Sequence, residues 1–267
     1  MGELDKSGKS SGRRKFLKSV SAIGAALPAA ALAADHAHQH SHVAQAGSGS
    51  VKGLSQPQVH GWLTQPEVAF IEAAIARLIP ADELGPGAKE AGVSYFIDQQ
   101  LAGAYGTMAR NYRLGPWPEG TPQQGYQSRL MPQEVYRTAI REIDSYCSSR
   151  FQKPFHQIGN ERQDEVLKEL ETGKVSLESV PAALFFSLLL ANTIEGFFAD
   201  PIYGGNRGKA GWKLVGFPGV AASYGNFIEK HNVPYVAEPV SIADMQNLMV
   251  GVDEHGHPIH VLLSKKD

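Results

Sequence analysis

The residues best suited to chemistry lie between Asn192 and Gly219. Glu195 stands at the end of an apolar run, where burial of an unpaired carboxylate would be costly, and Arg207 is its expected ionic partner. A glutamate with a raised pKa could act as a general acid if a second carboxylate faced it, and Asp200 is the candidate. A salt bridge that anchors the following loop explains the same residues without catalysis. We therefore predict Glu195 as a structural anchor and assign no catalytic residue.

The loop after this run combines glycines with aromatic side chains. Gly204-Gly205 permits positive φ or close backbone approach. The segment matches neither GxGxxG nor GxxxxGK[ST] and follows a helical run, so no nucleotide or other cofactor site is predicted. Aromatic side chains around such a loop suit a rigid contact surface, and ordinary loop packing is the alternative. The residues predicted to contact a partner protein are Cys147, Asp200, Tyr203, Gly204, Gly205, Asn206, Arg207 and Trp212.

Cys147 is the single cysteine of the chain. One thiol excludes an internal disulfide framework, a cysteine-held iron–sulfur cluster and a CxxCH haem site. Because Cys147 lies on an apolar helical stripe, a buried thiol is predicted. A disulfide to another exported chain is the alternative.

Two histidine groups raise the question of metal binding, and neither is predicted as a metal site. The first alternates within Asp35–His42 (His36, His38, His40, His42) and is followed by a Gly-Ser linker, so an unstructured spacer is predicted, with weak metal binding as the alternative. The second comprises His255, His257 and His260, which flank turn residues near the C-terminus. A solvated hairpin is predicted there.

Helical periodicity dominates the elements that must position these residues. We expect helices from Thr64 as N-cap to Pro80, from about Ala88, from Pro132 through Cys147, over Asn160–Glu171, over Pro181–Ala199 and, short, near Tyr224–His231. The run at Pro181–Ala199 is apolar all round at its start, which predicts a central buried helix. Residues 110–126 predict an ordered surface loop, since their aromatic side chains would otherwise be exposed, and Ile259–Leu263 gives a weak β signal. The fold class is mainly α: a single irregular helical domain with long ordered loops, over residues 61–267.

The N-terminus has the pattern of an export signal. Arg13 and Arg14, followed by Phe16 and Leu17, resemble the twin-arginine consensus, although Gly12 departs from it before the pair. A moderately apolar stretch and an Ala-x-Ala site ending at Ala33 follow, with a second possible cleavage site ending at Ala46. We predict a twin-arginine signal peptide over residues 1–33, a flexible linker over 34–60, and export to the periplasm.

The charge of the chain is unevenly distributed. The formal net charge is −2, but residues 1–18 hold six Lys/Arg against two acidic residues, so the remainder has a net charge of −6. An acidic body has no basic footprint for nucleic acid. The longest apolar run is roughly half of the ~20 residues that a membrane span requires.

The segment that opened this section resembles a known family. Thr193-x-Glu195-Gly196-x-Phe198-x-Asp200-Pro201-x-Tyr203-Gly204-Gly205-Asn206-Arg207, then Gly211-Trp212 and Gly216-Phe217-Pro218-Gly219, is similar to the gluconate 2-dehydrogenase subunit 3 family. The upstream Leu78–Asp82 and Gly85–Ala88, and the twin-arginine leader, fit the same family. The resemblance covers roughly Gln65 to Val220.

This resemblance implies the small subunit of a membrane-associated sugar or sugar-acid dehydrogenase. A separate large subunit would hold FAD and oxidise the substrate, and a possible cytochrome subunit with haem c would pass electrons to the membrane. Because twin-arginine export moves folded cargo, the expectation is that this chain escorts and stabilises the flavin-loaded partner. The alternative is a stand-alone periplasmic hydrolase or binding protein that uses Glu195 and Asp200.

Overall fold

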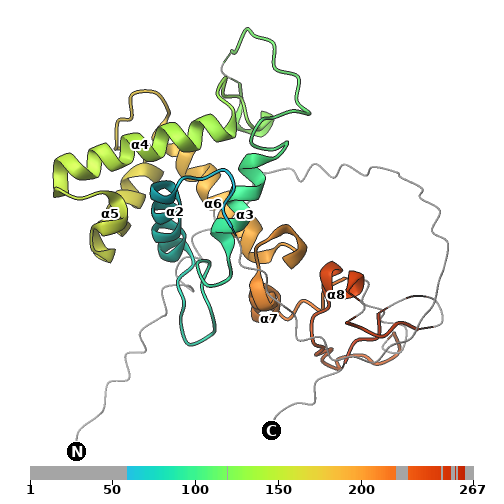
Figure 1. Ribbon diagram of the computed structural model, residues 1–267. Coiled ribbons are helices and arrows are strands. Elements are labelled where there is room, and N and C mark those ends of the chain that lie inside the picture. Colours follow the sequence, from blue (N-terminus) through green and yellow to red (C-terminus); the bar gives the residue numbers. More distant parts are fainter. Residues whose placement is uncertain are drawn as a thin grey trace, which may run out of the picture.

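The computed structural model describes residues 59–118, 120–220, 228–247, 249–253, 256 and 258–261. Within them, a helical body is formed by α2 (Gln65–Leu78), α3 (Val93–Ala102), α4 (Pro132–Phe151), α5 (Asn160–Glu171) and α6 (Ala182–Phe198), as Figure 1 shows. Short helices follow or connect them: η2 (Pro122–Gln124), η3 (Phe155–Gln157), η4 (Pro201–Tyr203), η5 (Arg207–Lys209), α7 (Ala210–Val215) and α8 (Ile242–Gln246). This part of the chain has no strand, only isolated β-bridges. The mainly helical prediction is confirmed.

Helix α6 lies at the centre of the body, as its apolar composition predicts, and contacts α2, α3, α4 and α5. Phe185 and Leu189 are fully buried. The Phe185 ring packs edge-on against Tyr136 of α4, with ring centroids 5.4 Å apart, and it also contacts Phe70 of α2. Among the described residues, no helix combines the length and the apolar character that crossing a membrane requires.

The start of α2 follows the sequence prediction. The Glu67 carboxylate accepts hydrogen bonds from the backbone N–H and the hydroxyl of Thr64, both at 2.8 Å. These contacts satisfy groups at the helix N-terminus. The predicted start of the next helix is wrong, because α3 begins at Val93 and not near Ala88. Gly92 has φ +75° and interrupts the helical backbone just before it.

A buried carboxylate that the sequence analysis did not single out joins α3 to the chain entering α2. Asp98 is fully buried and accepts hydrogen bonds from the backbone N–H groups of Gly61, Trp62 and Leu63 at 2.7–3.0 Å. Charge-assisted bonds of this kind are among the stronger ones in proteins. Asp98 therefore fixes the path of the chain before the first helix of the body.

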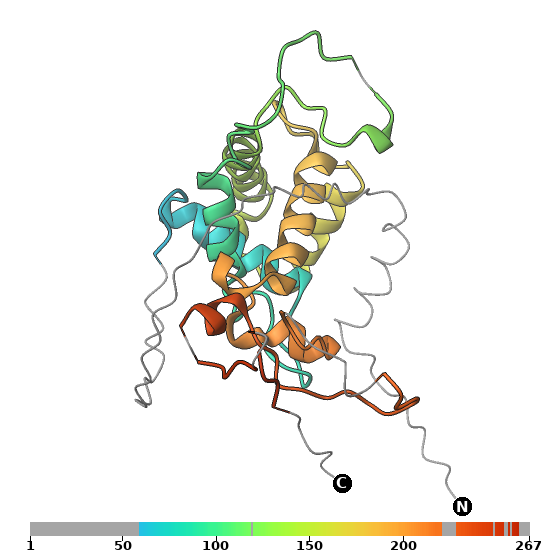
Figure 2. The same ribbon diagram turned by 90° about the vertical axis from the view of Figure 1, so that its right-hand side faces the viewer.

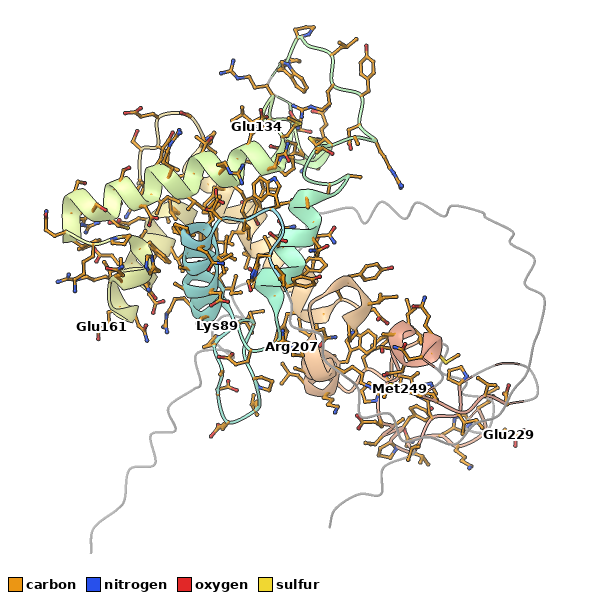
Figure 3. All side chains as sticks on the ribbon, in the orientation of Figure 1. Lys89, Glu134, Glu161, Arg207, Glu229 and Met249 are labelled. Carbon is orange, nitrogen blue, oxygen red and sulfur yellow. The ribbon has the colours of Figure 1, made fainter. Side chains whose placement is uncertain are left out.

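An irregular loop, here called the arm (residues 107–130), leaves the body between α3 and α4 and projects from it in both ribbon views (Figures 1 and 2). Glu134, in the first turn of α4, lies at its base (Figure 3). The arm is a surface loop as predicted, but it does not shield all its aromatic residues. Tyr112 is 85% exposed and Trp117 is 44% exposed. The expected burial is wrong because no other described element covers the arm.

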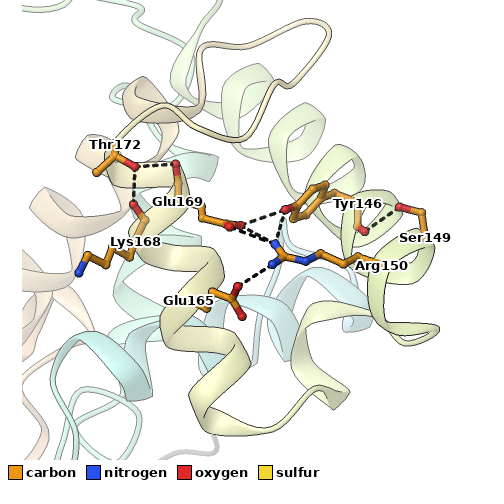
Figure 4. A network of polar contacts seen from close by, with 7 residues as sticks. All are labelled: Tyr146, Ser149, Arg150, Glu165, Lys168, Glu169 and Thr172. Carbon is orange, nitrogen blue, oxygen red and sulfur yellow. Dashed lines mark hydrogen bonds and ion pairs between the residues drawn. The ribbon is translucent and has the colours of Figure 1, made fainter.

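The outer end of the body is held by a polar network between α4 and α5 (Figure 4). Arg150 of α4 donates to Glu165 and Glu169 of α5, and Tyr146 also donates to Glu169. The network lies on the surface, so its contribution to stability is modest, and its main effect is to set the position of α5 against α4. The bounds of α5 agree with the sequence prediction.

Candidate functional site

The residues singled out by type and spacing lie in the glycine-rich segment (residues 192–219), which runs from the end of α6 through α7. Its first polar group, Asn192, is buried in the apolar helix. The Oδ1 atom of Asn192 accepts from the hydroxyl groups of Tyr136 (2.8 Å) and Tyr105 (3.2 Å). Burial raises the pKa of Tyr105 to about 12 and also raises that of Tyr136. Both phenols therefore remain protonated donors at neutral pH.

Glu195 has a different partner from the one predicted. The Oε2 atom of its carboxylate accepts from Asn192 Nδ2 at 3.1 Å, whereas Arg207 was the expected partner. The side chain is exposed to solvent, so it does not need an ion pair to offset burial. The predicted Glu195–Arg207 salt bridge is wrong, because Asn192, one helical turn earlier, lies within reach of the carboxylate.

Asp200 is buried and holds backbone groups. Its Oδ1 atom accepts from Ile202 N (3.0 Å), at the start of η4, and its Oδ2 atom accepts from Ile242 N (2.8 Å), at the start of α8. One carboxylate thus caps two short helices that are far apart in sequence. Both carboxylate oxygens of Asp200 accept hydrogen bonds from backbone groups. The structure therefore gives no support to Glu195 and Asp200 as a catalytic acid–base pair.

The glycines of the segment permit close backbone packing. A Cβ atom on Gly205 would lie 2.1 Å from the carbonyl oxygen of Gly196 in α6, and one on Gly204 would lie 2.4 Å from the Tyr95 ring. Gly204 also has φ +99°, a left-handed conformation that glycine adopts readily. Glycine is therefore required at these two positions because the loop lies directly on α6 and α3.

Asn206 is the central anchor of the loop. It is fully buried; its Nδ2 donates to Ala199 O and its Oδ1 accepts from Gly211 N, both at 2.8 Å. Its φ of +48° is left-handed, a conformation that asparagine tolerates better than most residues. The backbone N–H of the next residue, Arg207, donates to Ala91 O. Asn206 thus ties the loop both to the residue after α6 and to α7.

Trp212 has a structural role as well. It is 5% exposed, its Nε1 donates to Phe198 O at 2.7 Å, and Phe217 packs edge-on against it. Of the residues predicted to contact a partner, Tyr203 and Arg207 are exposed. Tyr203 lines an open depression of about 510 Å³ together with Phe96, Gln100, Glu195, Phe198 and Ala199.

The C-terminal part of the described chain packs on the segment from outside. Lys209 Nζ donates to Asp244 Oδ2 (2.8 Å) and Pro239 O (2.7 Å). Burial alone would raise the pKa of the Asp244 carboxyl, but the hydrogen bonds from Lys209 and Ser241 lower it below its ordinary value. Arg207 lies between the helical body and this part, which carries Met249 (Figure 3).

Cys147 lies in the core on the apolar face of α4, as the helical stripe predicts. Its thiol is fully buried, and burial raises its pKa to about 12. A thiol in this environment is neutral and inaccessible to a second chain. The structure therefore supports the buried thiol over the interchain disulfide.

Most residues of the two histidine groups and of the predicted export signal lie outside the described part of the chain. Arg13, Arg14, Phe16 and Leu17, the alternating histidines of Asp35–His42, and His255 and His257 lie outside the described residues, as does the first half of the short helix expected near Tyr224–His231. The second half of that segment, residues 228–231, is described and is not helical. His260 is half-buried, and the start of the expected β segment makes no strand. Among the residues described, no group of three or more His, Cys, Asp or Glu side chains could hold a metal ion.

The protein is thus a helical domain whose body packs around the central helix α6. Asp200, Asn206 and Trp212 of the glycine-rich segment hold the chain that follows this helix in place. The family model described as Gluconate 2-dehydrogenase subunit 3 matches residues 65–219, more than half of the chain. The chain belongs to this family, as its motifs predict. The match begins with α2 and ends at Gly219, where the chain pairs with Val240. Neither the curated proteins nor the solved structures give a match.

Sequence reasoning missed the polar groups that act over long distances. Asp98 and Tyr105 stand in segments with no motif, and their partners are far away along the chain. Asn192 did carry a signal, because it is an amide within an otherwise apolar run. A buried amide requires partners, and a search for tyrosines on neighbouring helices would have been justified.

Proposed function

We propose that this chain is the non-catalytic small subunit of a periplasmic, membrane-associated, flavin-dependent dehydrogenase of the gluconate type. In this role it escorts the FAD-bearing large subunit through twin-arginine export and stabilises it. A cytochrome subunit with haem c is a possible third component. Membership of a family of dehydrogenase subunits supports the oxidoreductase complex. The substrate, a sugar or a sugar acid, would contact the large subunit.

One observation carries the non-catalytic assignment. The distinctive polar side chains of the family segment, Asp200, Asn206 and the Trp212 indole, direct their hydrogen bonds to backbone groups of this chain. Catalytic groups must instead be free to meet substrate within hydrogen-bond reach. The alternative of a hydrolase built on Glu195 and Asp200 also lacks a free second carboxylate.

The escort role follows from the export route. The twin-arginine pathway carries folded cargo, which matters when a cofactor must be inserted before export. The leader of this chain could serve a partner that has none of its own, provided that the two assemble first. The net charge of −6 beyond residue 18 and the exposed Tyr203 surface suit a soluble protein that binds another chain.

The test is to express the large subunit with and without this chain and to measure flavin and dehydrogenase activity in the periplasm. We expect activity there to require the chain and to be lost when Arg13 and Arg14 are both replaced by lysine. A version lacking residues 1–33 is the matched control, and it should keep the total activity while leaving it in the cytoplasm. Periplasmic activity that does not depend on this chain would remove the escort role.

A further inference from the structure

The arm carries three large apolar side chains that are exposed and close together in the sequence. Tyr112 is 85% exposed, Leu114 71% and Trp117 44%, all within six residues. Arginines alternate with them, at Arg110 and Arg113. Tryptophan, tyrosine and arginine are the residues most enriched among those that dominate binding energy at protein interfaces. The composition of the arm is therefore that of an interface centre, although no motif marks it.

Internal contacts hold the arm in one shape. The Arg113 guanidinium donates to Arg129 O and lies 5.5 Å from the centroid of the Trp117 ring. Near the tip, Gln127 bridges Gly120 N and Thr121 O at 2.7 and 2.8 Å. At the base, the Tyr126 hydroxyl donates to Leu130 O at 2.6 Å. A loop ordered by its own hydrogen bonds loses less conformational entropy when it binds.

Charge indicates the kind of surface that the arm would meet. The arm contains Arg110, Arg113 and Arg129 against a single acidic residue, Glu119, whereas the chain beyond residue 18 has a net charge of −6. Arg110 and Arg129 are exposed. Complementary potentials across an interface increase the association rate and suppress wrong partners. The partner surface should therefore combine an apolar pocket with carboxylates around it.

The contacts of the arm favour a protein over a lipid surface. Its backbone is irregular, and irregular backbone is not tolerated in the hydrocarbon region of a bilayer. Arg113 lies over one face of Trp117, so insertion of the ring would bring the guanidinium into the same layer. A protein pocket with carboxylates can accept both groups together. Membership of a family of complex subunits also requires a protein partner.

We propose that the arm, residues 107–130, is the docking element for the large flavin-bearing subunit. Tyr112, Leu114 and Trp117 enter an apolar pocket on that subunit, and carboxylates at its rim face Arg110 and Arg129. This inference rests on the proposed function, because it takes the large subunit as the partner. It moves the main contact away from the glycine-rich segment, whose predicted contact residues are mostly buried.

In the experiment, a tagged version of this chain is expressed in the organism that makes it, and the complex is purified through the tag. The amount of flavin bound per chain is then measured. In the arm variant, Tyr112, Leu114 and Trp117 are all replaced by serine. In the matched control, three exposed apolar residues outside both the arm and the glycine-rich segment, Leu84, Val233 and Val236, are replaced by serine. We expect the flavin bound per chain to fall at least about tenfold in the arm variant and to stay within about twofold of wild type in the control. Thermal unfolding of both purified chains shows that they are folded.

Each other outcome has a defined meaning. Flavin retained within twofold by the arm variant, or lost equally from both variants, would overturn the docking role of the arm while leaving the proposed function intact. A wild-type chain that carries no flavin would overturn the proposed function itself. Sedimentation of the mature chain with phosphatidylglycerol vesicles, abolished in the arm variant, would assign the arm to lipid.

A charge reversal tests the rim separately. Arg110→Glu should reduce flavin retention several-fold at low salt, and the difference from wild type should shrink as salt is raised, because screening weakens exposed charge pairs. Lys174→Glu, an exposed reversal at the far end of α5, is the control for net charge. Equal retention by both reversals would rule out carboxylates around the pocket.

Discussion

The glycine-rich segment (residues 192–219) and the arm (residues 107–130) both combine glycines with aromatic residues, but they use them in different ways. In the segment, Asn206 and Trp212 are buried and bonded to the backbone of this chain. In the arm, Tyr112 and Leu114 face solvent. The segment with the family motif fixes the fold and exposes only part of its aromatic side chains, Tyr203 and Phe217, whereas the arm carries the most exposed one, Tyr112. A recognisable motif therefore does not by itself mark the contact surface.

The prediction with the largest expected effect tests whether the glycine-rich segment fixes the fold, and it concerns Asn206. Asn206→Ala removes two buried hydrogen bonds to backbone groups, and we expect the free energy of unfolding to fall by about 4 kcal/mol. Asn232→Ala is the control, since Asn232 has a similar left-handed φ of +60° but is exposed. Urea unfolding of both variants measures the difference. Similar losses in the two would mean that backbone conformation, and not the buried amide, explains the cost.

A smaller effect concerns the packing of the C-terminal part on the segment. The pKa of Asp244 is lowered in the folded state, so its contribution to stability is present above the ordinary carboxyl pKa and is lost as pH falls through the lowered value. Below about pH 4, we expect the protection factors of residues 239–247 against hydrogen exchange to fall several-fold in the wild type. In Asp244→Asn, the protection factors should be lower already at pH 7 and should change little with pH. A parallel pH response in both would exclude Asp244 as the titrating group.

The smallest expected effect is on the stability of the arm variant. Replacing Tyr112, Leu114 and Trp117 by serine removes side chains that face solvent, so the free energy of unfolding should change by no more than about 0.5 kcal/mol per residue. Thermal unfolding of the purified chain measures this. A loss well above that range would show that the arm packs on the body, and the contrast between the two regions would disappear.

The sequence predicted most helices well because apolar residues recur at helical spacing. The ends of α5 agree with the pattern, and Thr64 was correctly expected before α2. The start of α3 was misplaced because Ala88 and Ala91, which look helical, are buried in turns before Gly92. The local pattern therefore located the helices, but it failed where buried alanines lie in turns and not in a helix.

The site was harder to predict than the helices. Its residue types were visible, but the pairing of Glu195 with Arg207 was inferred from spacing along the chain, and the carboxylate bonds Asn192. The contact of Asp200 with Ile242 joins residues that no local pattern connects. Opposite charges in a flexible loop have many possible partners, and only packing selects among them.

The sequence by itself determined the helical class, the central position of α6, the burial of Cys147 and the family, because each depends on local periodicity or on a contiguous motif. Only the tertiary structure decided that Gly205 lies against Gly196, that Asp98 holds the entry to α2, and that the arm stays exposed. These features depend on contacts between residues far apart in the chain. The free energy of such a contact exists only once the intervening helices have packed.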